Sequence, residues 1–247
     1  MPWRSLLAVL LGGLVLPVAA VARTPGPVAP PSRAAAPLAK VVVATTARSA
    51  PGRGRVVQRL ATRARWGHGP VVLLVLESAT TDDGLVWLRV RLPVRPNDAD
   101  GWIRADHVLL ERTTWRLEIA TSTRRARVLH RWRVVRSFGI VVGAPGTPTP
   151  AGLFAIAEKI RQADPRGFLG PWALHLTAHS RVLFDFGGGE GRIALHGRDG
   201  ASLADPIGSA ASHGCVRMDD RNVRYLARVL PTGAPVRIVR SFSPLAA

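Results

Sequence analysis

Two histidines and the only cysteine of the chain lie close together in its last quarter. His196 follows the apolar run at 193–195, and His213 and Cys215 belong to the segment SHGC at 212–215. A free thiol is only a few per cent thiolate at neutral pH, so a nucleophilic cysteine needs a base within hydrogen-bond reach. The imidazole of either histidine can accept that proton. These residue types therefore predict a cysteine nucleophile served by a histidine base.

Two other interpretations of these residues compete with catalysis. A lone cysteine can fill a core, and His196, His213 and Cys215 can together bind zinc. Gly214 argues against core filling, because a glycine beside the thiol lets the backbone come close to a bound molecule. His213 and Cys215 are two positions apart, which is not a familiar zinc spacing, and no second cysteine completes a ligand set. We expect neither a metal nor an organic cofactor.

The neighbouring sequence predicts the elements that carry these side chains. The apolar run before His196 predicts that this residue ends a strand. Apolar residues at helical spacing predict a helix over 219–230, with Asp219 or Asp220 as its N-cap. Cys215 would then lie just before a helix N-terminus, where backbone N–H groups favour a thiolate and bind an oxyanion.

The rest of the chain is predicted to be mostly β. Residues 115–143 contain three strands with alternating apolar positions, and a turn rich in Pro and Gly leads to a further strand at 154–157. Runs at 41–43, 71–76 and 85–92 predict short antiparallel strands separated by tight turns. Together these earlier strands fit a small β-barrel.

The N-terminal residues predict export. Arg4 precedes an apolar run at 6–16, and the small residues Ala-Val-Ala end at Ala22 just before Arg23. This stretch is short for a membrane span, so cleavage after Ala22 is favoured over a retained anchor. The predicted organisation is a signal at 1–22, a linker rich in Pro and Ala at 23–37, a β domain at 38–112, a second domain at 113–240 and a tail at 241–247.

Composition indicates a globular protein with an anionic partner. The 247 residues are 47% hydrophobic and 20% charged, which excludes wholesale disorder, collagen and coiled coil. Basic residues outnumber acidic ones 34 to 16, giving a net charge of +18, and only Lys40 and Lys159 are lysine. Such a field attracts any polyanion, whether nucleic acid, an anionic membrane or an acidic polymer outside the cell. A solvated arginine-rich surface is the alternative to a dedicated nucleic-acid site. No nucleic-acid motif accompanies it, so we expect anionic polymers of the cell envelope and no nucleic acid.

Part of the first β domain resembles a known module. The stretch WLRVRLPVRPNDADGWIRADHVL at 87–109 is similar to the bacterial SH3-like modules of cell-wall proteins. The resemblance implies a small β-barrel that binds the wall. A barrel that only packs against its neighbour is the alternative.

The second domain resembles the L,D-transpeptidase catalytic domain, also called the YkuD domain. The pattern is His-Gly at 196–197, then a loop, then SHGC followed by a hydrophobic residue and Arg217. The similarity extends through VVGAPGTPTPAGLF, GPWALHLTAHS and NVRYLARVLPTGAPVRIV, so it covers about residues 115–240. It implies a mostly β fold: a YkuD-like β-sandwich with few short helices.

The resemblance also implies a role for each matching residue. Cys215 would be the nucleophile and His196 its base, oriented by the backbone carbonyl of Gly197. His213 would line the site and tune the thiol, and the N–H groups of Gly214 and Cys215 would form the oxyanion hole. The loop at 161–172 is expected to be a lid over the cleft. Substrate contacts are expected from Ser212, Arg217 and Trp172, the last at a place where the family often has tyrosine.

The implied reaction acts on peptidoglycan stem peptides. The thiolate would attack the bond between a diamino acid and the terminal D-alanine, release D-alanine and leave a thioester. An amine acceptor then gives a 3→3 cross-link, whereas water gives a tripeptide, the carboxypeptidase alternative. A non-catalytic wall-binding protein is the other alternative. We expect a monomer in the cell wall or periplasmic space, touching a membrane only through a retained signal.

Overall fold

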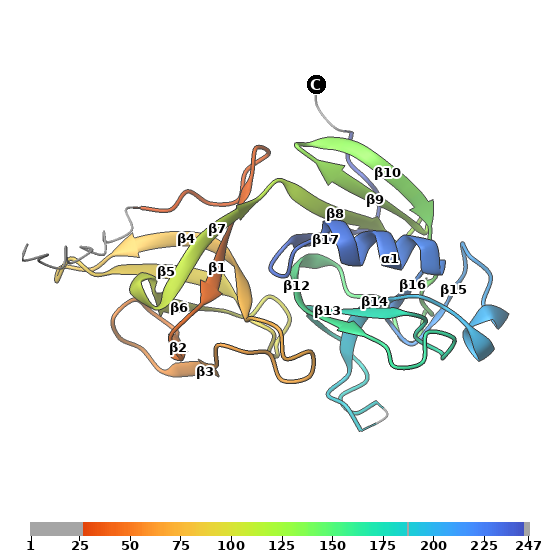
Figure 1. Cartoon of the computed structure of the whole chain (residues 1–247), viewed down its shortest axis with the longest axis horizontal. Coiled ribbons are helices and arrows are strands. Elements are labelled where there is room, and N and C mark those ends of the chain that lie inside the picture. Colours follow the sequence, from red (N-terminus) through yellow and green to blue (C-terminus); the bar gives the residue numbers. More distant parts are fainter. Residues whose placement is uncertain (1–26, 187, 245–247) are drawn as a thin grey trace, which may run out of the picture.

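The computed structural model describes residues 27–186 and 188–244, and these form a mostly β protein with few helices. Two bodies of sheet lie side by side along the long axis of the molecule (Figure 1). The predicted signal at 1–22 lies outside the described residues, as do the first four positions of the predicted linker and the last three of the tail.

The first body is a seven-stranded antiparallel sheet with the strand order β3-β2-β6-β5-β4-β1-β7. The predicted strand at 71–76 overlaps the first part of β4, and the one at 85–92 contains all of β5. The SH3-like barrel stays a prediction. The strands are β1 (Ala36–Val41), β2 (Thr45–Arg48), β3 (Val56–Leu60), β4 (Val72–Thr80), β5 (Val86–Arg91), β6 (Asp100–Arg104) and β7 (Val108–Thr113).

The bounds of β1 differ from the expected ones at both ends. The strand begins at Ala36, which is fully buried, so the last two residues of the predicted linker belong to the sheet. It ends at Val41, and Val42 and Val43 are exposed beyond it, although the sequence predicted a strand through them. Valine favours strands through packing on a half-buried surface, and these two positions have no such surface.

The second body centres on an eight-stranded mixed sheet with the order β10-β9-β8-β17-β12-β13-β14-β16. Strands β11 and β15 form a separate parallel pair. The elements are β8 (Trp115–Ala120), β9 (Arg125–His130), β10 (Arg133–Gly139), β11 (Val142–Gly143), β12 (Gly152–Arg161), β13 (Trp172–His179), β14 (Arg192–His196), β15 (Ala210–Ser212), β16 (Val216–Arg217), α1 (Asp220–Val229) and β17 (Pro235–Val239).

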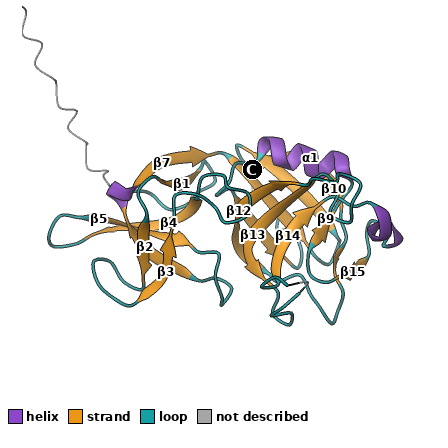
Figure 2. Ribbon diagram, turned by 60° about the horizontal axis from the view of Figure 1, so that its bottom comes forward, coloured by secondary structure: helices purple, strands orange, loops and turns teal. Residues whose placement is uncertain are grey.

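The eight-stranded sheet curves around one apolar core. Ala126 and Val128 of β9 belong to the same buried cluster as Ile193 and Leu195, which lie near the other end of the sheet. Helix α1 packs on this core through the apolar face that its 3.6-residue spacing predicted, and Figure 2 shows it lying across the strands. The core therefore fixes the strand ends and the helix start between which the candidate site lies.

The two bodies share a contact surface with apolar and polar parts. Leu38 and Leu74 of the first sheet belong to one buried cluster with Ala155 of β12. Beside it, the buried carboxylate of Glu158 accepts hydrogen bonds from the backbone N–H groups of Trp66 and Gly67, at 3.1 and 2.8 Å. These contacts hold the loop after β3 against β12.

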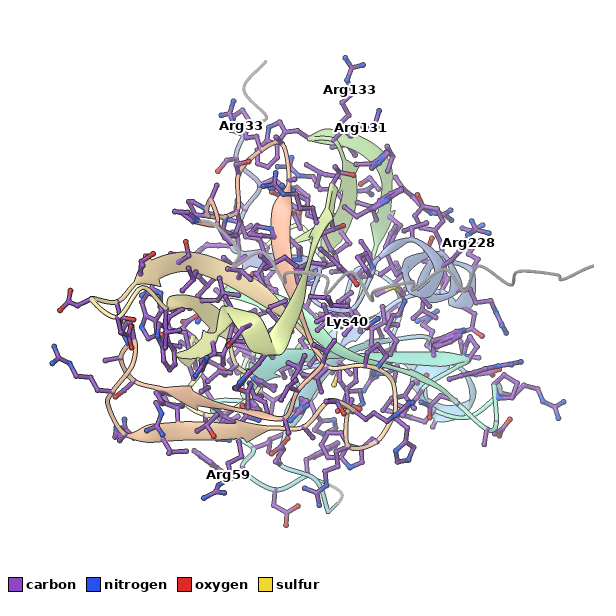
Figure 3. All side chains as sticks on the ribbon, turned by 60° about the vertical axis from the view of Figure 1, so that its left-hand side comes forward. Arg33, Lys40, Arg59, Arg131, Arg133 and Arg228 are labelled. Atoms are coloured by element: carbon purple, nitrogen blue, oxygen red, sulfur yellow. The ribbon has the colours of Figure 1, made fainter. Side chains whose placement is uncertain are left out.

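The surface carries arginine on both bodies. Arg59 on the first sheet, Arg131 and Arg133 at the β9–β10 turn and Arg228 on α1 all extend into solvent (Figure 3). The positive charge is therefore spread over the molecule. Within the described residues, no helix has the length and apolar character needed to cross a bilayer.

Candidate active site

Parallel pairing of β14 and β16 brings His196 and Cys215 to the same end of the sheet. Leu195 pairs with Val216 and His196 pairs with Arg217. Cys215 directly precedes β16, and His196 is the last residue of β14, as the sequence predicted for a strand end. Two segments separated by a long loop thus place the predicted nucleophile and the predicted base on neighbouring strands.

The His196 ring is buried and held by the main chain. His196 is only 1% exposed, and its Nδ1 lies 2.7 Å from the carbonyl oxygen of Gly197. A carbonyl only accepts, so Nδ1 carries the hydrogen and donates it, which leaves Nε2 with a free lone pair. Burial lowers the pKa of His196 to about 4, and the charges of Arg217 and His175 act in the same direction, against the Gly197 hydrogen bond. The ring is therefore neutral at pH 7.

The Cys215 thiol is half-buried and protonated at neutral pH. The backbone N–H of Ala194 donates to Sγ at 3.3 Å, while burial raises the pKa of the thiol. The expected help from a helix N-terminus is absent because α1 begins only at Asp220, beyond β16. Among residues 27–186 and 188–244, no hydrogen bond joins Sγ to His196 or His213. The resting pair is a neutral thiol beside a neutral imidazole.

The turn that carries Cys215 is held by Ser212. The Ser212 hydroxyl donates to the carbonyl of Cys215 at 2.6 Å and accepts from the N–H of Gly214 at 3.1 Å. Ser212 is buried, and its hydroxyl is used by the backbone of the turn. The substrate contact expected from the sequence stays a prediction. The Gly214 N–H, predicted as an oxyanion donor, is already engaged. In the part of the chain that the structure describes, the Cys215 N–H has no acceptor.

Two threonines that the sequence analysis did not single out also fix this turn. Thr149 Oγ1 donates to the carbonyl of Gly214 at 2.8 Å and accepts from the N–H of Gly143 at 2.8 Å. Thr147 Oγ1 donates to the carbonyl of Ser212 at 3.0 Å. Both lie in the segment that the sequence predicted only as a Pro and Gly turn. The carbonyls to which they donate lie 65 residues further along the chain, so local sequence carried no signal for these two contacts.

Arg217 is paired within the protein. Its guanidinium forms an ion pair with the carboxylate of Asp205 and lies over the ring of Phe168, 4.8 Å from the ring centre. The residue is only 4% exposed. The expected contact with a substrate carboxylate would have to compete with Asp205. In this structure Arg217 instead contributes charge beside His196 and Cys215, favouring the neutral imidazole and the thiolate.

Exposed aromatic rings border both histidines. The ring centre of Phe168 lies 6.0 Å from that of His196, and that of Phe186 lies 5.1 Å from that of His213. His213 itself is exposed, and the two phenylalanines are 46% and 51% exposed. The sequence analysis named neither phenylalanine. Phe168 belongs to the predicted lid at 161–172, which connects β12 to β13 by turns.

Trp172 meets the site through its backbone. It is the first residue of β13, and its carbonyl accepts a long hydrogen bond of 3.4 Å from the N–H of Gly197. Its side chain is half-buried against the core of the second body. The structure thus brings Trp172 beside the residue that orients His196, and it packs the indole inward.

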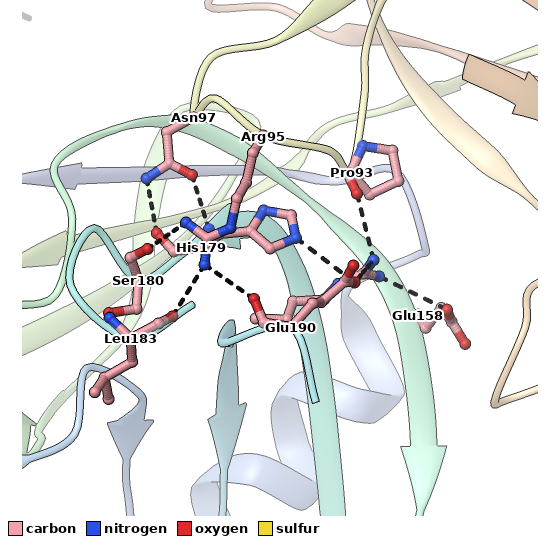
Figure 4. Close-up of polar contacts among 9 residues, drawn as sticks. Pro93, Arg95, Asn97, Glu158, His179, Ser180, Leu183 and Glu190 are labelled. Atoms are coloured by element: carbon pink, nitrogen blue, oxygen red, sulfur yellow. Dashed lines mark hydrogen bonds and ion pairs between the residues drawn. The ribbon is translucent and has the colours of Figure 1, made fainter. Parts of the chain in front are cut away.

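The first body holds the segment that carries Phe186 (Figure 4). Arg95, in the loop between β5 and β6, donates to the carbonyls of Ser180, Leu183 and Glu190 at 2.5, 3.0 and 2.9 Å. Asn97 makes a reciprocal pair with the backbone of His179, both bonds at 2.8 Å. Two side chains of the first body therefore fix both ends of the connection between β13 and β14.

His175 and His179, predicted to be structural, both lie in β13. The backbone of His179 pairs with Asn97, and its Nε2 lies 3.6 Å from Glu190 Oε1. Burial lowers the pKa of each histidine, with the charge of Arg192 acting in the same direction. Across the residues that the structure describes, no group of three or more His, Cys, Asp or Glu side chains is arranged to hold a metal ion.

Solved structures and curated proteins resemble the chain. An L,D-transpeptidase from Mycobacterium smegmatis is 18% identical with a TM-score of 0.40, covering 72% of this chain and 95% of that one. A mutant Enterococcus faecium L,D-transpeptidase is 17% identical with a TM-score of 0.41, covering 81% and 76%. A Bacillus licheniformis protein and a Bacillus subtilis protein, both carrying the name L,D-transpeptidase YkuD, are 33% identical over 124 and 108 residues.

The matched regions make up 50% and 44% of this chain, and 65% and 56% of the two Bacillus proteins. The chain thus spans less than two thirds of the length of these curated relatives. The model of the family described as the L,D-transpeptidase catalytic domain, YkuD, matches residues 114–238, just over half of the chain. That range includes both histidines, the cysteine and the turn that holds it. The chain belongs to the YkuD family of L,D-transpeptidase catalytic domains.

Proposed function

We propose that the chain is a peptidoglycan L,D-transpeptidase with Cys215 as nucleophile and His196 as general base. The observation that carries the proposal is the 2.7 Å contact between His196 Nδ1 and the Gly197 carbonyl, which leaves Nε2 as an acceptor. A base of this kind, one strand from the only thiol of the chain, is what a thiol nucleophile requires.

The proton moves during the attack. Because the thiol pKa is raised and the imidazole pKa is lowered, a preformed thiolate–imidazolium pair is disfavoured in the resting state. Substrate binding draws Sγ and Nε2 together, since hydrogen bonds of this kind often tighten only in the substrate complex. Nε2 then takes the thiol proton as Sγ attacks the carbonyl carbon between the diamino acid and D-alanine.

The tetrahedral intermediate collapses to a thioester. The Cys215 N–H supports the developing oxyanion, because the Gly214 N–H already donates to Ser212. The imidazolium returns its proton to the departing nitrogen, the C–N bond breaks and D-alanine leaves. The acyl group stays on Sγ, and His196 is again neutral and ready for the second half of the reaction.

An amine acceptor completes the transfer. The side-chain amine of a neighbouring stem attacks the thioester carbonyl and loses its proton to His196. The C–S bond then breaks, Sγ takes that proton back as the thiol, and the new amide is the 3→3 cross-link. Exposed aromatic rings at Phe168 and Phe186 support transfer over hydrolysis, because apolar walls around a thioester reduce the water available to it. Attack by water would instead give the tripeptide product of an L,D-carboxypeptidase.

The setting follows from this substrate. Peptidoglycan lies outside the cytoplasm, so the protein acts there, in agreement with the export signal that the first 22 residues predict. A monomer stays the expectation from the sequence. The net charge of +18 favours a location among anionic envelope polymers. An SH3-like first body would add wall binding to its contacts with the catalytic body.

Mass spectrometry of products from a disaccharide tetrapeptide tests the proposal, with the Cys215→Ala variant assayed beside the wild-type chain. A cysteine-dependent dimer that has lost one D-alanine is the expected result. Tripeptide without dimer would replace the proposal by the carboxypeptidase. No change in the substrate would favour the wall-binding protein, for which sedimentation with purified peptidoglycan is the direct measurement.

A further inference from the structure

The peptide unit between Gly197 and Arg198 is held at both of its polar ends. Its carbonyl accepts from His196 Nδ1 at 2.7 Å, and its N–H donates to Asp220 Oδ1 at 3.1 Å. The two groups share electrons through amide resonance, so a negative charge at the N–H makes the carbonyl a stronger acceptor. Asp220 thus reaches the His196 ring through one peptide unit.

Close packing fixes the position of this carboxylate. A Cβ added at Gly197 would overlap Asp220 Oδ1 and would lie 2.9 Å from Pro171 Cδ and 3.1 Å from Gly170 Cα. Gly170 has φ +63, and a Cβ there would lie 2.8 Å from Gly197 Cα. The two glycines and the Asp220 carboxylate are in direct contact, and a side chain at position 170 or 197 would not fit between them.

The surroundings of Asp220 combine burial with opposing charges. It is the first residue of α1, and burial raises the pKa of its carboxyl, with the charges of Asp199 and Asp219 acting in the same direction. The Arg198 N–H and the charge of Arg224 favour the ionised form. The carboxylate is thus only partly solvated. It accepts a hydrogen bond from the Arg198 N–H, which belongs to the same peptide unit as the carbonyl that contacts His196.

We propose that Asp220 is a positioning residue that fixes the tautomer and orientation of His196 through the Gly197–Arg198 peptide. The inference rests on the proposed role of His196 as base. When His196 takes the thiol proton, the Gly197 carbonyl, polarised by Asp220, stabilises the positive ring. Asp220 therefore has the role of the acidic residue of a catalytic triad, but it acts through the peptide unit and does not contact the imidazole.

Two substitutions of Asp220 and one of Asp219 test whether the charge of Asp220 acts on His196. Asp220→Asn keeps an oxygen acceptor of the same shape and removes the charge, whereas Asp220→Ala removes both. Asp219→Asn is the matched control. It removes the adjacent carboxylate, which lies 3.7 Å from Arg198 Nε and 3.9 Å from Arg221 and makes no hydrogen bond to the Arg198 N–H in the described chain.

Steady-state kinetics on the tetrapeptide give the first readout. We expect Asp220→Asn to lower kcat about tenfold and Asp220→Ala about a hundredfold, by analogy with the residues that orient histidine ligands in metal sites. KM should stay within about twofold of the wild-type value, because Asp220 does not contact substrate. Asp219→Asn should leave both constants within about twofold.

The proton resonance of His196 Nδ1–H gives a second readout that needs no substrate. A weaker carbonyl acceptor should shift this resonance upfield in Asp220→Asn and leave it unchanged in Asp219→Asn. Equal kcat values for the two Asn variants, together with an unmoved resonance, would overturn the proposal, even if Asp220→Ala fails to fold. Wild-type protein that does not process the tetrapeptide would instead refute the proposed function, while the resonance still tests Asp220.

Discussion

His196 Nδ1 donates to the carbonyl of Gly197, the very next residue, across 2.7 Å. In a Ser-His-Asp triad an acidic side chain occupies this place. Here the orientation of His196, the proposed base, depends on the backbone of the loop after β14, and therefore on the packing of glycines at 170 and 197. Changes that move this backbone should affect catalysis as directly as changes to the histidine.

Gly197→Ala should disable the enzyme by overpacking. The new methyl would overlap Asp220 Oδ1 and meet Pro171 Cδ at 2.9 Å, so the loop must shift and carry the Gly197 carbonyl with it. We expect a loss of about 1–3 kcal/mol in the free energy of unfolding and a fall in kcat of at least about a hundredfold. Gly146→Ala is the control, because nothing lies within 4 Å of its Cβ position. Unchanged kcat in Gly197→Ala would contradict the backbone role.

Cys215→Ala should abolish product formation and leave the fold intact. Sγ accepts one weak hydrogen bond, from Ala194 at 3.3 Å, so its removal should change the free energy of unfolding by about 1 kcal/mol or less. Urea unfolding and product analysis by mass spectrometry check the two halves of this expectation. Residual transfer in the variant would mean that another group is the nucleophile.

Alkylation by iodoacetamide should reveal a protonated resting thiol. Because burial raises the pKa of Cys215, less thiolate is present at pH 7 than for a free cysteine, and the rate should be lower than that of a cysteine peptide. The rate should rise with pH beyond the ordinary thiol range, with no plateau near neutrality. A pH-independent rapid reaction between pH 5 and 8 would indicate an ion pair instead.

Local sequence was enough to predict the elements that carry His196 and Cys215, the proposed reacting residues. The His-Gly and SHGC segments place Cys215 and His196, and the 3.6-residue spacing predicted the helix that forms α1. The N-cap of α1 is Asp219, one of the two residues predicted for that position, although its side chain makes no capping hydrogen bond. These features depend on neighbours a few positions apart, which a single sequence reveals.

The partners that these residues have within the protein depend on distant parts of the chain, and the sequence did not predict them. Arg217 was expected to meet substrate, but the fold brings Asp205 to it. The Gly214 N–H was expected in the oxyanion hole, but the Ser212 hydroxyl accepts from it. The contact of Arg95 with Ser180 joins groups 85 positions apart. Such pairings follow from strand order and loop packing, for which the sequence has no short-range pattern.

Acid should destabilise the protein through buried histidines. The pKa of His196 is about 4 in the folded state against 6.5 for a solvent-exposed imidazole, so the unfolded chain binds more protons between these two pH values. The stability that a neutral His196 contributes is present above pH 6.5 and is lost as pH falls to 4, by about 3 kcal/mol. Urea unfolding of wild type and His196→Gln at pH 7 and pH 4 measures it.

The variant should lose less stability than wild type over that interval. His175 and His179, whose pKa values burial also lowers, act in the same direction and remain in the variant, so part of the acid sensitivity should persist. Identical pH dependence in the two proteins would show that His196 is not the buried neutral ring described here.

Arg95→Ala should weaken the contact between the two bodies and reduce activity together. The guanidinium donates to three carbonyls at 180, 183 and 190 and lies 4.5 Å from the ring centre of Phe184. Its loss leaves these carbonyls to water or unpaired, which should cost about 2–4 kcal/mol in the free energy of unfolding. The segment bearing Phe186 would then be free to move from His213, and kcat/KM should fall.

Arg59→Ala provides the matched control for that experiment. Arg59 is exposed on β3 of the same body, and its side chain makes no hydrogen bond or ion pair within the described residues. Truncating it to alanine should change the free energy of unfolding by about 0.5 kcal/mol or less. Both variants lose one positive charge, so a shared fall in activity would point to electrostatic attraction of substrate. A fall confined to Arg95→Ala, with a matching loss of stability, would show that the first body supports the wall of the active site.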